Sequence, residues 1–84
     1  MVLLRRVDDV EELREVGGQV VVVHDGRLLA LNRVGTRIWD YLDQPRAPEE
    51  VVDALRQAWP GAPVDEDVGP FIARLRDLGI VVEA

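Results

Sequence analysis

The stretch from Gln19 to Leu31, QVVVVHDGRLLAL, constrains the fold more than any other part of the chain. Two apolar runs flank an Asp-Gly pair, which is a strong signal for a two-residue turn between antiparallel strands. Both runs are apolar at nearly every position, whereas a small sheet with one wet face shows alternating apolar and polar residues. The hairpin is therefore expected to meet apolar partners on both of its faces.

A three-stranded meander is predicted around this hairpin. Gly17-Gly18 lies just before it and is a second two-residue turn signal, so a strand is expected on its N-terminal side; the alternative is a helical turn over residues 10–16. Four consecutive valines, which are β-branched, make the middle strand the clearest of the three. The strands are expected at residues 12–16, 19–23 and 27–31, with residues 2–6 adding a short edge strand.

Three helices are predicted after the meander, because the apolar residues change to a spacing near 3.6. Proline and glycine bound these stretches, since neither continues a helix well. Trp39 is expected at the centre of the core, and the apolar segment from Ile80 to Val82 is expected to lie back on it. The helices are expected from the N-cap Asn32 to Pro45, from Pro48 to Pro60, and from the N-cap Asp65 to Gly79.

The order of these elements predicts an α+β fold: a three-stranded antiparallel sheet followed by three helices, winged-helix-like, in one domain over residues 1–84. Hydrophobic residues make up 48% of the chain, enough for a core, and the charged residues form no long like-charge block, which argues against disorder. No apolar run is long enough for a signal peptide or a membrane span, so we expect no membrane partner and a cytoplasmic location.

Side chains that carry out catalysis or bind metals are scarce in this sequence. Cysteine and serine are absent, and Thr36 and Tyr41 are the only hydroxyl residues. His24, the single histidine, is expected to be a solvated turn residue, since one histidine without cysteine does not make a usual zinc site. The acidic run at residues 65–67 fits the positive end of a helix. We therefore expect no enzyme activity, no catalytic residue, no metal site and no cofactor.

The net charge of −6 argues against nucleic acid as a partner, because proteins that bind it usually carry a basic surface. A winged-helix-like DNA-binding regulator would read DNA with the third helix. That helix contains Arg74 and Arg76, but also acidic residues that repel phosphate. This regulator is one alternative function. Another is a structural subunit of a larger assembly, which pairs with its own copy through the apolar edge.

The chain contains LALNRVGTRIWDYLD at residues 29–43, PEEVVDAL at 48–55 and LRDLGIV at 75–81. In this order and spacing, the segments resemble the PqqD-like family, the leader-peptide recognition domains of ribosomal peptide natural-product pathways, over residues 8–83. The Ile38-Trp39 pair and the short chain are most similar to the stand-alone recognition proteins of lasso-peptide clusters. The resemblance implies a non-catalytic adaptor that binds a precursor's leader peptide and presents it to a separate leader protease.

The resemblance also implies how a leader is bound: it adds as a strand to the open edge of the third strand, in a groove beside the third helix. Leu29 and Leu31 share one face of that strand, and Leu28 and Ala30 share the other. One set feeds the core, and the other needs an apolar partner. The expected peptide-binding residues are Arg27, Leu28, Leu29, Ala30, Leu31, Phe71, Arg74, Leu75 and Leu78.

Several of these residues have a second interpretation. Arg27 and Arg74 are expected to pair with leader carboxylates, but a solvated surface role suits them equally. Phe71 and Leu75 fall at helical spacing, which also suits the core. The resemblance further implies a leader tyrosine in an apolar pocket under the third helix, and roughly eight to ten extended leader residues would cover the edge.

Overall fold

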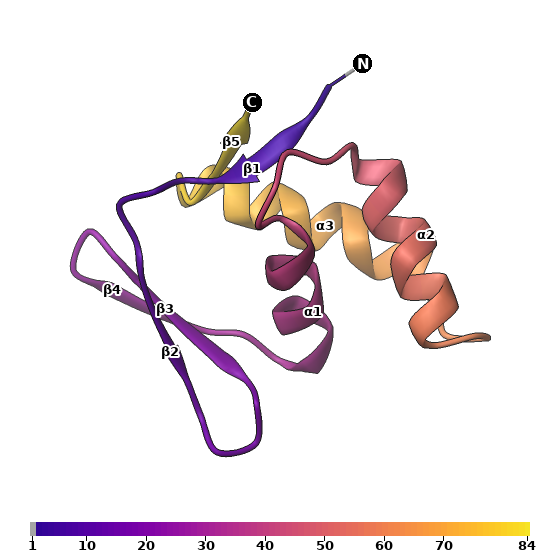
Figure 1. The fold of residues 1–84 in the computed structure, drawn as a ribbon, viewed down its shortest axis with the longest axis horizontal. Helices are drawn as coiled ribbons and strands as arrows, with labels where there is room; N and C mark the ends of the chain where they lie inside the picture. Colours follow the sequence, from indigo (N-terminus) through magenta and orange to yellow (C-terminus); the bar gives the residue numbers. More distant parts are fainter. Residues whose placement is uncertain (1) are drawn as a thin grey trace.

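The computed structural model describes residues 2–84 (Figure 1). The predicted fold is confirmed, because a three-stranded antiparallel sheet in the order β2-β3-β4 precedes three helices. In Figure 1 this sheet lies at the lower left, and α1 lies between it and α2. The elements are β1 (Leu4–Arg6), β2 (Glu11–Arg14), β3 (Val20–His24), β4 (Arg27–Ala30), α1 (Arg33–Tyr41), α2 (Pro48–Ala58), α3 (Val64–Asp77) and β5 (Val81–Glu83).

The two ends of the chain form a second, two-stranded sheet, a pairing that the sequence does not predict. β1 pairs antiparallel with β5, with Leu4 opposite Glu83 and Arg6 opposite Val81. On its other side, Leu4 exchanges two backbone hydrogen bonds with Arg46, of 2.8 and 2.9 Å. The expected strand near the N-terminus is therefore present, but its partner is the C-terminal segment. Both ends lie together at the top of Figure 1, away from β4.

The turn between β3 and β4 is the predicted two-residue turn, but the turn before β3 is not. Asp25 and Gly26 both have positive φ, 52° and 76°, as a type I′ turn requires. In the earlier turn only Gly18 has positive φ, 85°, and the N–H of Glu15 donates to the carbonyl of Gln19 over 2.8 Å. A three-residue loop with one left-handed glycine joins the strands there, so β2 ends earlier than predicted.

The start of α1 agrees with the sequence, whereas the start of α3 does not. The Asn32 side chain accepts a hydrogen bond of 2.8 Å from the backbone N–H of Gly35, as expected of an N-cap. The predicted cap of α3 is wrong: α3 begins at Val64, and Asp65 lies inside its first turn. The carboxylate of Asp65 instead pairs with Arg56 of α2 over 2.6 Å. Within residues 2–84, no helix combines the length and apolar composition needed to cross a membrane.

The end of α3 is a Schellman motif centred on Gly79, the residue predicted to follow the helix. The N–H of Ile80 donates to the carbonyl of Leu75 over 3.1 Å, and the N–H of Gly79 donates to Arg76 over 3.0 Å. Gly79 has a φ of 77°, the left-handed conformation that this motif needs. The motif turns Ile80 into the core and leaves Leu78 half-buried at the end of the helix.

Trp39 lies in the core with no exposed surface, as predicted. Its indole N–H donates to the carboxylate of Glu12 in β2 over 2.5 Å, which satisfies the one polar group of the buried ring. Ile80 and Val81 are also buried, so the C-terminal segment lies back on the core as predicted. The other buried apolar side chains are Leu4, Val20, Val22, Leu31, Ile38, Leu42, Ala47, Val51, Leu55, Val64, Val68, Ile72 and Leu75.

Gly79→Ala is expected to lower the free energy of unfolding by about 1 kcal/mol, because alanine is strained at positive φ. Gly17 provides the control, since its φ is not positive and an added Cβ meets nothing within 4 Å. Gly17→Ala is expected to raise the free energy of unfolding by about 0.5–1 kcal/mol, because alanine fits this backbone and restricts the unfolded chain. Urea unfolding followed by circular dichroism measures both changes. Changes in the same direction would contradict the backbone described for α3.

Candidate functional site

At the free edge of β4, the backbone N–H and C=O groups of two residues point away from β3 and have no neighbouring strand. Leu31 donates its N–H to the carbonyl of Val20 over 2.9 Å. In an antiparallel ladder alternate residues bond to the neighbouring strand, so Leu29 also bonds to β3, while Leu28 and Ala30 face outward. Within the described chain, no strand lies along this edge. The N–H and C=O groups of Leu28 and Ala30 are therefore available to an added strand.

The two faces of β4 differ in burial, as expected from side chains that point alternately to opposite faces of a strand. Leu29 is half-buried and Leu31 is buried in the core. On the other face, Leu28 is 72% exposed and Ala30 is exposed as well. The side chains of Leu29 and Leu31 thus form a wall beside α3. Leu28 and Ala30, whose side chains lie on the exposed face, are the residues with free backbone groups.

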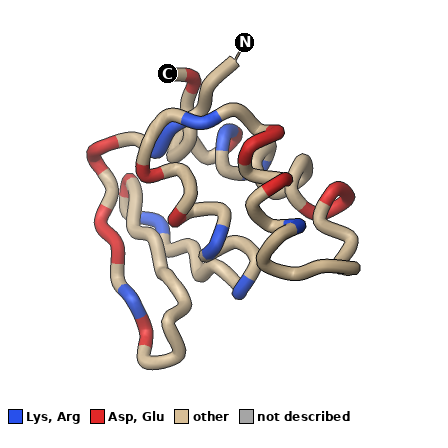
Figure 2. The backbone as a smooth tube through the Cα atoms, turned by 45° about the vertical axis from the view of Figure 1, so that its right-hand side comes forward, with Lys and Arg blue, Asp and Glu red and all other residues tan. Residues whose placement is uncertain are grey.

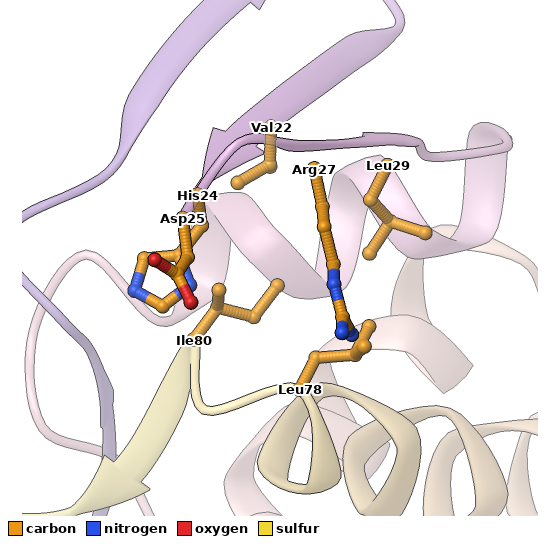
Figure 3. A pocket seen from close by; sticks show the side chains of 7 residues that line it. All are labelled: Val22, His24, Asp25, Arg27, Leu29, Leu78 and Ile80. Carbon is orange, nitrogen blue, oxygen red and sulfur yellow. The ribbon is translucent and has the colours of Figure 1, made fainter.

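A pocket with apolar walls lies between β4 and the end of α3, and the polar side chains His24, Asp25 and Arg27 also line it (Figure 3). Val22 and Leu29 line it from the sheet, Leu78 and Ile80 line it from the other side, and the Arg27 side chain extends from β4 toward Leu78. Its volume is about 140 Å³. A buried cavity of about 150 Å³ holds one benzene molecule, so this pocket has room for one ring-sized side chain.

His24 lies at the mouth of this pocket, and the expectation that it is a solvated turn residue is wrong. Only 22% of its side chain is exposed, and its Nε2 lies 3.7 Å from the carboxylate of Asp9. The segment before β2 approaches the hairpin at this point and shields the imidazole. Local sequence patterns do not predict this contact, because Asp9 precedes β2 and His24 ends β3, 15 residues further along the chain.

A second hollow lies where α3 begins beside α1. Phe71 and Arg74 of α3 line it together with Asn32 and Val34 of α1. The acidic side chains Glu66 and Asp67 also line it. We define the β4–α3 groove as the surface that runs along the free edge of β4 from the pocket at Leu78 to this hollow at Phe71.

Burial divides the predicted site residues between the groove and the core. Phe71 and Leu78 are half-buried and line the two ends of the groove. Leu75 is completely buried and Leu31 is 3% exposed, so both belong to the core and direct contact with a peptide is not expected of them. Leu75 lies one helical turn from both Phe71 and Leu78 and packs beneath them.

Arg27 and Arg74 are exposed cations at the groove, and neither has an ion pair or an aromatic ring as partner within the described residues. The other arginines each have such a partner. Arg33 and Arg37 stack on Trp59, and the rest pair with carboxylates. Arg27 and Arg74 are therefore the two arginines of the groove free to pair with a ligand, although the carboxylates of Asp25, Glu66 and Asp67 also line the groove.

Two exposed ion pairs elsewhere shift arginine pKa values upward. The hydrogen bond to Asp40, together with the charge of that carboxylate, raises the pKa of Arg14. Asp65 raises the pKa of Arg56 in the same way. Exposed pairs of this kind contribute little to stability, and neither lies in the β4–α3 groove.

Gly35 positions Phe71, a role that the sequence analysis missed. An added Cβ on Gly35 would lie 2.7 Å from Cε2 of Phe71, closer than real Cβ atoms approach a neighbour. An isolated glycine within a helical pattern is the one sequence signal for such close packing. The place of the Phe71 ring, and hence one wall of the groove, depends on this glycine.

A free strand edge, a helix beside it and an apolar pocket between them form the arrangement that strand addition of an extended peptide requires. The model of the family described as Coenzyme PQQ synthesis protein D (PqqD) matches residues 19–81, which is most of the chain. The chain therefore belongs to the PqqD family, and the resemblance seen in its sequence is confirmed at this level.

A solved structure with a similar fold contains a bound peptide. It is described as TbiB1 in complex with the TbiA(beta) leader peptide. The two chains share 28% sequence identity and superpose with a TM-score of 0.79, over 92% of this chain and 93% of that chain. No curated protein is similar enough to match.

Gly35→Ala is expected to lower the free energy of unfolding by about 1–3 kcal/mol, because the Phe71 ring must move. In a Phe71→Ala background, the same change is expected to be neutral or to stabilise by up to about 1 kcal/mol, because alanine favours the helix. Urea unfolding of the four proteins forms a double-mutant cycle. An equal cost in both backgrounds would show that the alanine clashes with a group other than Phe71.

Proposed function

We propose that this protein binds the leader segment of a ribosomally made precursor peptide as an added strand on β4. The observation that carries the proposal is the pair of outward-facing peptide groups at Leu28 and Ala30, which have no partner among the described residues. An apolar groove lies beside them. TbiB1, which is similar over 92% of this chain, has a leader peptide bound, and this supports the same class of ligand here.

The pocket at Leu78 supports the expectation that a leader places a large side chain there. Its volume of about 140 Å³ suits one aromatic ring. Val22, Leu29 and Ile80 form apolar walls, and His24 provides a polar mouth. A tyrosine fits both features, because its ring is apolar and its hydroxyl is polar.

The length of β4 limits how much of the leader pairs with it. Its 4 residues span about 13 Å at about 3.3 Å per residue. A leader segment of roughly eight to ten residues therefore extends beyond both ends of the strand. One end would enter the pocket at Leu78, and the other would lie over the hollow at Phe71.

We further propose that the protein is a non-catalytic adaptor, which holds the leader in the cytoplasm while a separate protease cleaves it. The absence of serine and cysteine from the sequence supports this division of labour. The Ile38-Trp39 pair, similar to that of lasso-peptide recognition proteins, extends the proposal to a lasso-peptide precursor. Both side chains are buried in the core, so their role would be structural and not direct recognition.

Neither alternative function gains support from a particular feature of the fold. A DNA-reading helix needs a basic face, and the first turn of α3 is exposed and acidic at Asp65, Glu66 and Asp67. Pairing between two copies through β4 would use the same edge as the leader. Size-exclusion chromatography with and without leader distinguishes these two uses, because only self-pairing gives a dimer that the leader dissociates.

Ala30→Pro is expected to weaken leader binding at least about tenfold, because it removes an outward N–H from the edge of β4. The probe is the synthetic leader of a candidate precursor, sought among the short open reading frames beside this gene, and calorimetry gives the Kd. Ala30→Val is the matched control, because it keeps the N–H and valine suits a strand. Circular dichroism confirms that both variants are folded. Equal binding by the two variants and the wild type would exclude this edge as the leader site.

Arg27→Gln and Arg74→Gln are each expected to weaken leader binding by about twofold to tenfold, because charge-assisted hydrogen bonds to leader carboxylates are lost. The effect is expected to shrink in high salt, which screens exposed charges. Arg76→Gln is the control, since it removes the same charge from α3 but its partner is Glu83, at 3.2 Å. A loss of equal size in this control would reveal an effect of net charge and not of contact in the groove.

A further inference from the structure

A second cleft, distinct from the β4–α3 groove, lies on another side of α1. Arg33 and Arg37 line it from successive turns of α1, and Trp59 lines it from the end of α2. Arg14 of β2 and Asp40 of α1 complete this charged part of the lining. Figure 2 shows most acidic positions toward the edges of the molecule and several basic positions nearer its middle. We refer to this surface as the Trp59 cleft.

Two of the three arginines in the Trp59 cleft have no carboxylate partner within the described chain. Arg14 pairs with Asp40 over 2.9 Å. The guanidinium carbons of Arg33 and Arg37 lie 5.7 and 5.6 Å from the centre of the Trp59 ring. Stacking on an aromatic ring orients a guanidinium group but leaves its charge uncompensated. Three arginines against one aspartate make this cleft positive, although the protein's net charge is −6.

The Trp59 cleft and the β4–α3 groove meet at the first turn of α1. Asn32 and Val34 line the hollow at the end of the groove, whereas Arg33, between them in the chain, lines the cleft. A helix with its side chains is about 10–12 Å across. An extended peptide covers that distance in about three or four residues. A peptide that leaves β4 at Ala30 therefore reaches the cleft within a few residues.

We propose that the Trp59 cleft binds acidic side chains of the leader, in the flank that leaves β4 at its Ala30 end. This inference rests on the proposed function and names a second part of the same ligand. The acidic residues are expected about four to six positions beyond the segment that pairs with β4. Each leader is then held twice: by its backbone and a large side chain in the groove, and by its carboxylates in the cleft.

The chemistry of the cleft suits a carboxylate, the anionic group that peptide side chains carry. A guanidinium group presents parallel N–H donors that match the two oxygens of a carboxylate. The Trp59 ring already restricts Arg33 and Arg37, so less side-chain entropy is lost when a ligand binds. A nucleic acid would instead need a long basic surface, and Asp40 interrupts this one.

The test compares two peptides with three proteins, by calorimetry at low salt. One peptide is the leader of a candidate precursor, sought among the short open reading frames beside this gene. The other is the same peptide with every Asp and Glu outside the β4-pairing segment changed to Asn or Gln. The proteins are the wild type, the Arg33→Gln/Arg37→Gln variant and the control variant Arg56→Gln/Arg76→Gln. The control loses two charges whose partners, Asp65 and Glu83, line neither surface.

The Arg33→Gln/Arg37→Gln variant is expected to bind the native leader about fivefold to tenfold more weakly than the wild type, with the control within about twofold. The neutralised peptide is expected to bind the variant and the wild type equally, which identifies a direct contact. An equal loss with both peptides, no loss with either, or a leader flank without acidic residues would overturn the inference. In all three cases the wild type still binds the leader, whereas failure of the proposed function means that it binds neither peptide.

Discussion

The antiparallel pairing of β5 with β1 is the interaction on which the binding surface depends. An apolar C-terminal segment with free backbone groups would otherwise compete for the edge of β4. Two further backbone hydrogen bonds flank the β1–β5 ladder. The N–H of Val7 donates to the carbonyl of Ile80 over 3.0 Å, and the N–H of Ala84 donates to the carbonyl of Leu3 over 2.8 Å. Val81 is buried at the same time. The backbone groups of the C-terminal segment are thus paired within the chain, and the edge of β4 stays open for another molecule.

The apolar character of the hairpin on both faces has a physical explanation in this arrangement. The inward face, at Leu29 and Leu31, helps to form the core and one wall of the groove. Leu28 and Ala30, whose side chains lie on the outward face, are also the residues whose peptide groups are free. If β4 were polar, water would solvate its open edge well. A peptide that covered this edge would then bury less apolar surface, and its binding free energy would be less favourable.

Much of the fold followed from local pattern, and the errors have identifiable causes. The alternation along β4, the Asp-Gly turn and the Asn32 cap depend on residues close in the chain, and they were predicted correctly. Asp65 was misplaced because an ion pair with Arg56, on another helix, holds its carboxylate. At the site, helical spacing placed Phe71, Leu75 and Leu78 on one face, but spacing does not distinguish the buried Leu75 from its half-exposed neighbours.

The sequence by itself determined the order of strands and helices, the absence of cysteine and serine and the net negative charge, because each depends on composition or on neighbours a few residues apart. Only the tertiary structure decided that the tail pairs with β1, that Gly35 lies against Phe71 and that two arginines of α1 share Trp59. These contacts join segments that are distant in the chain. They arise from how whole elements pack against one another, and local periodicity does not specify that packing.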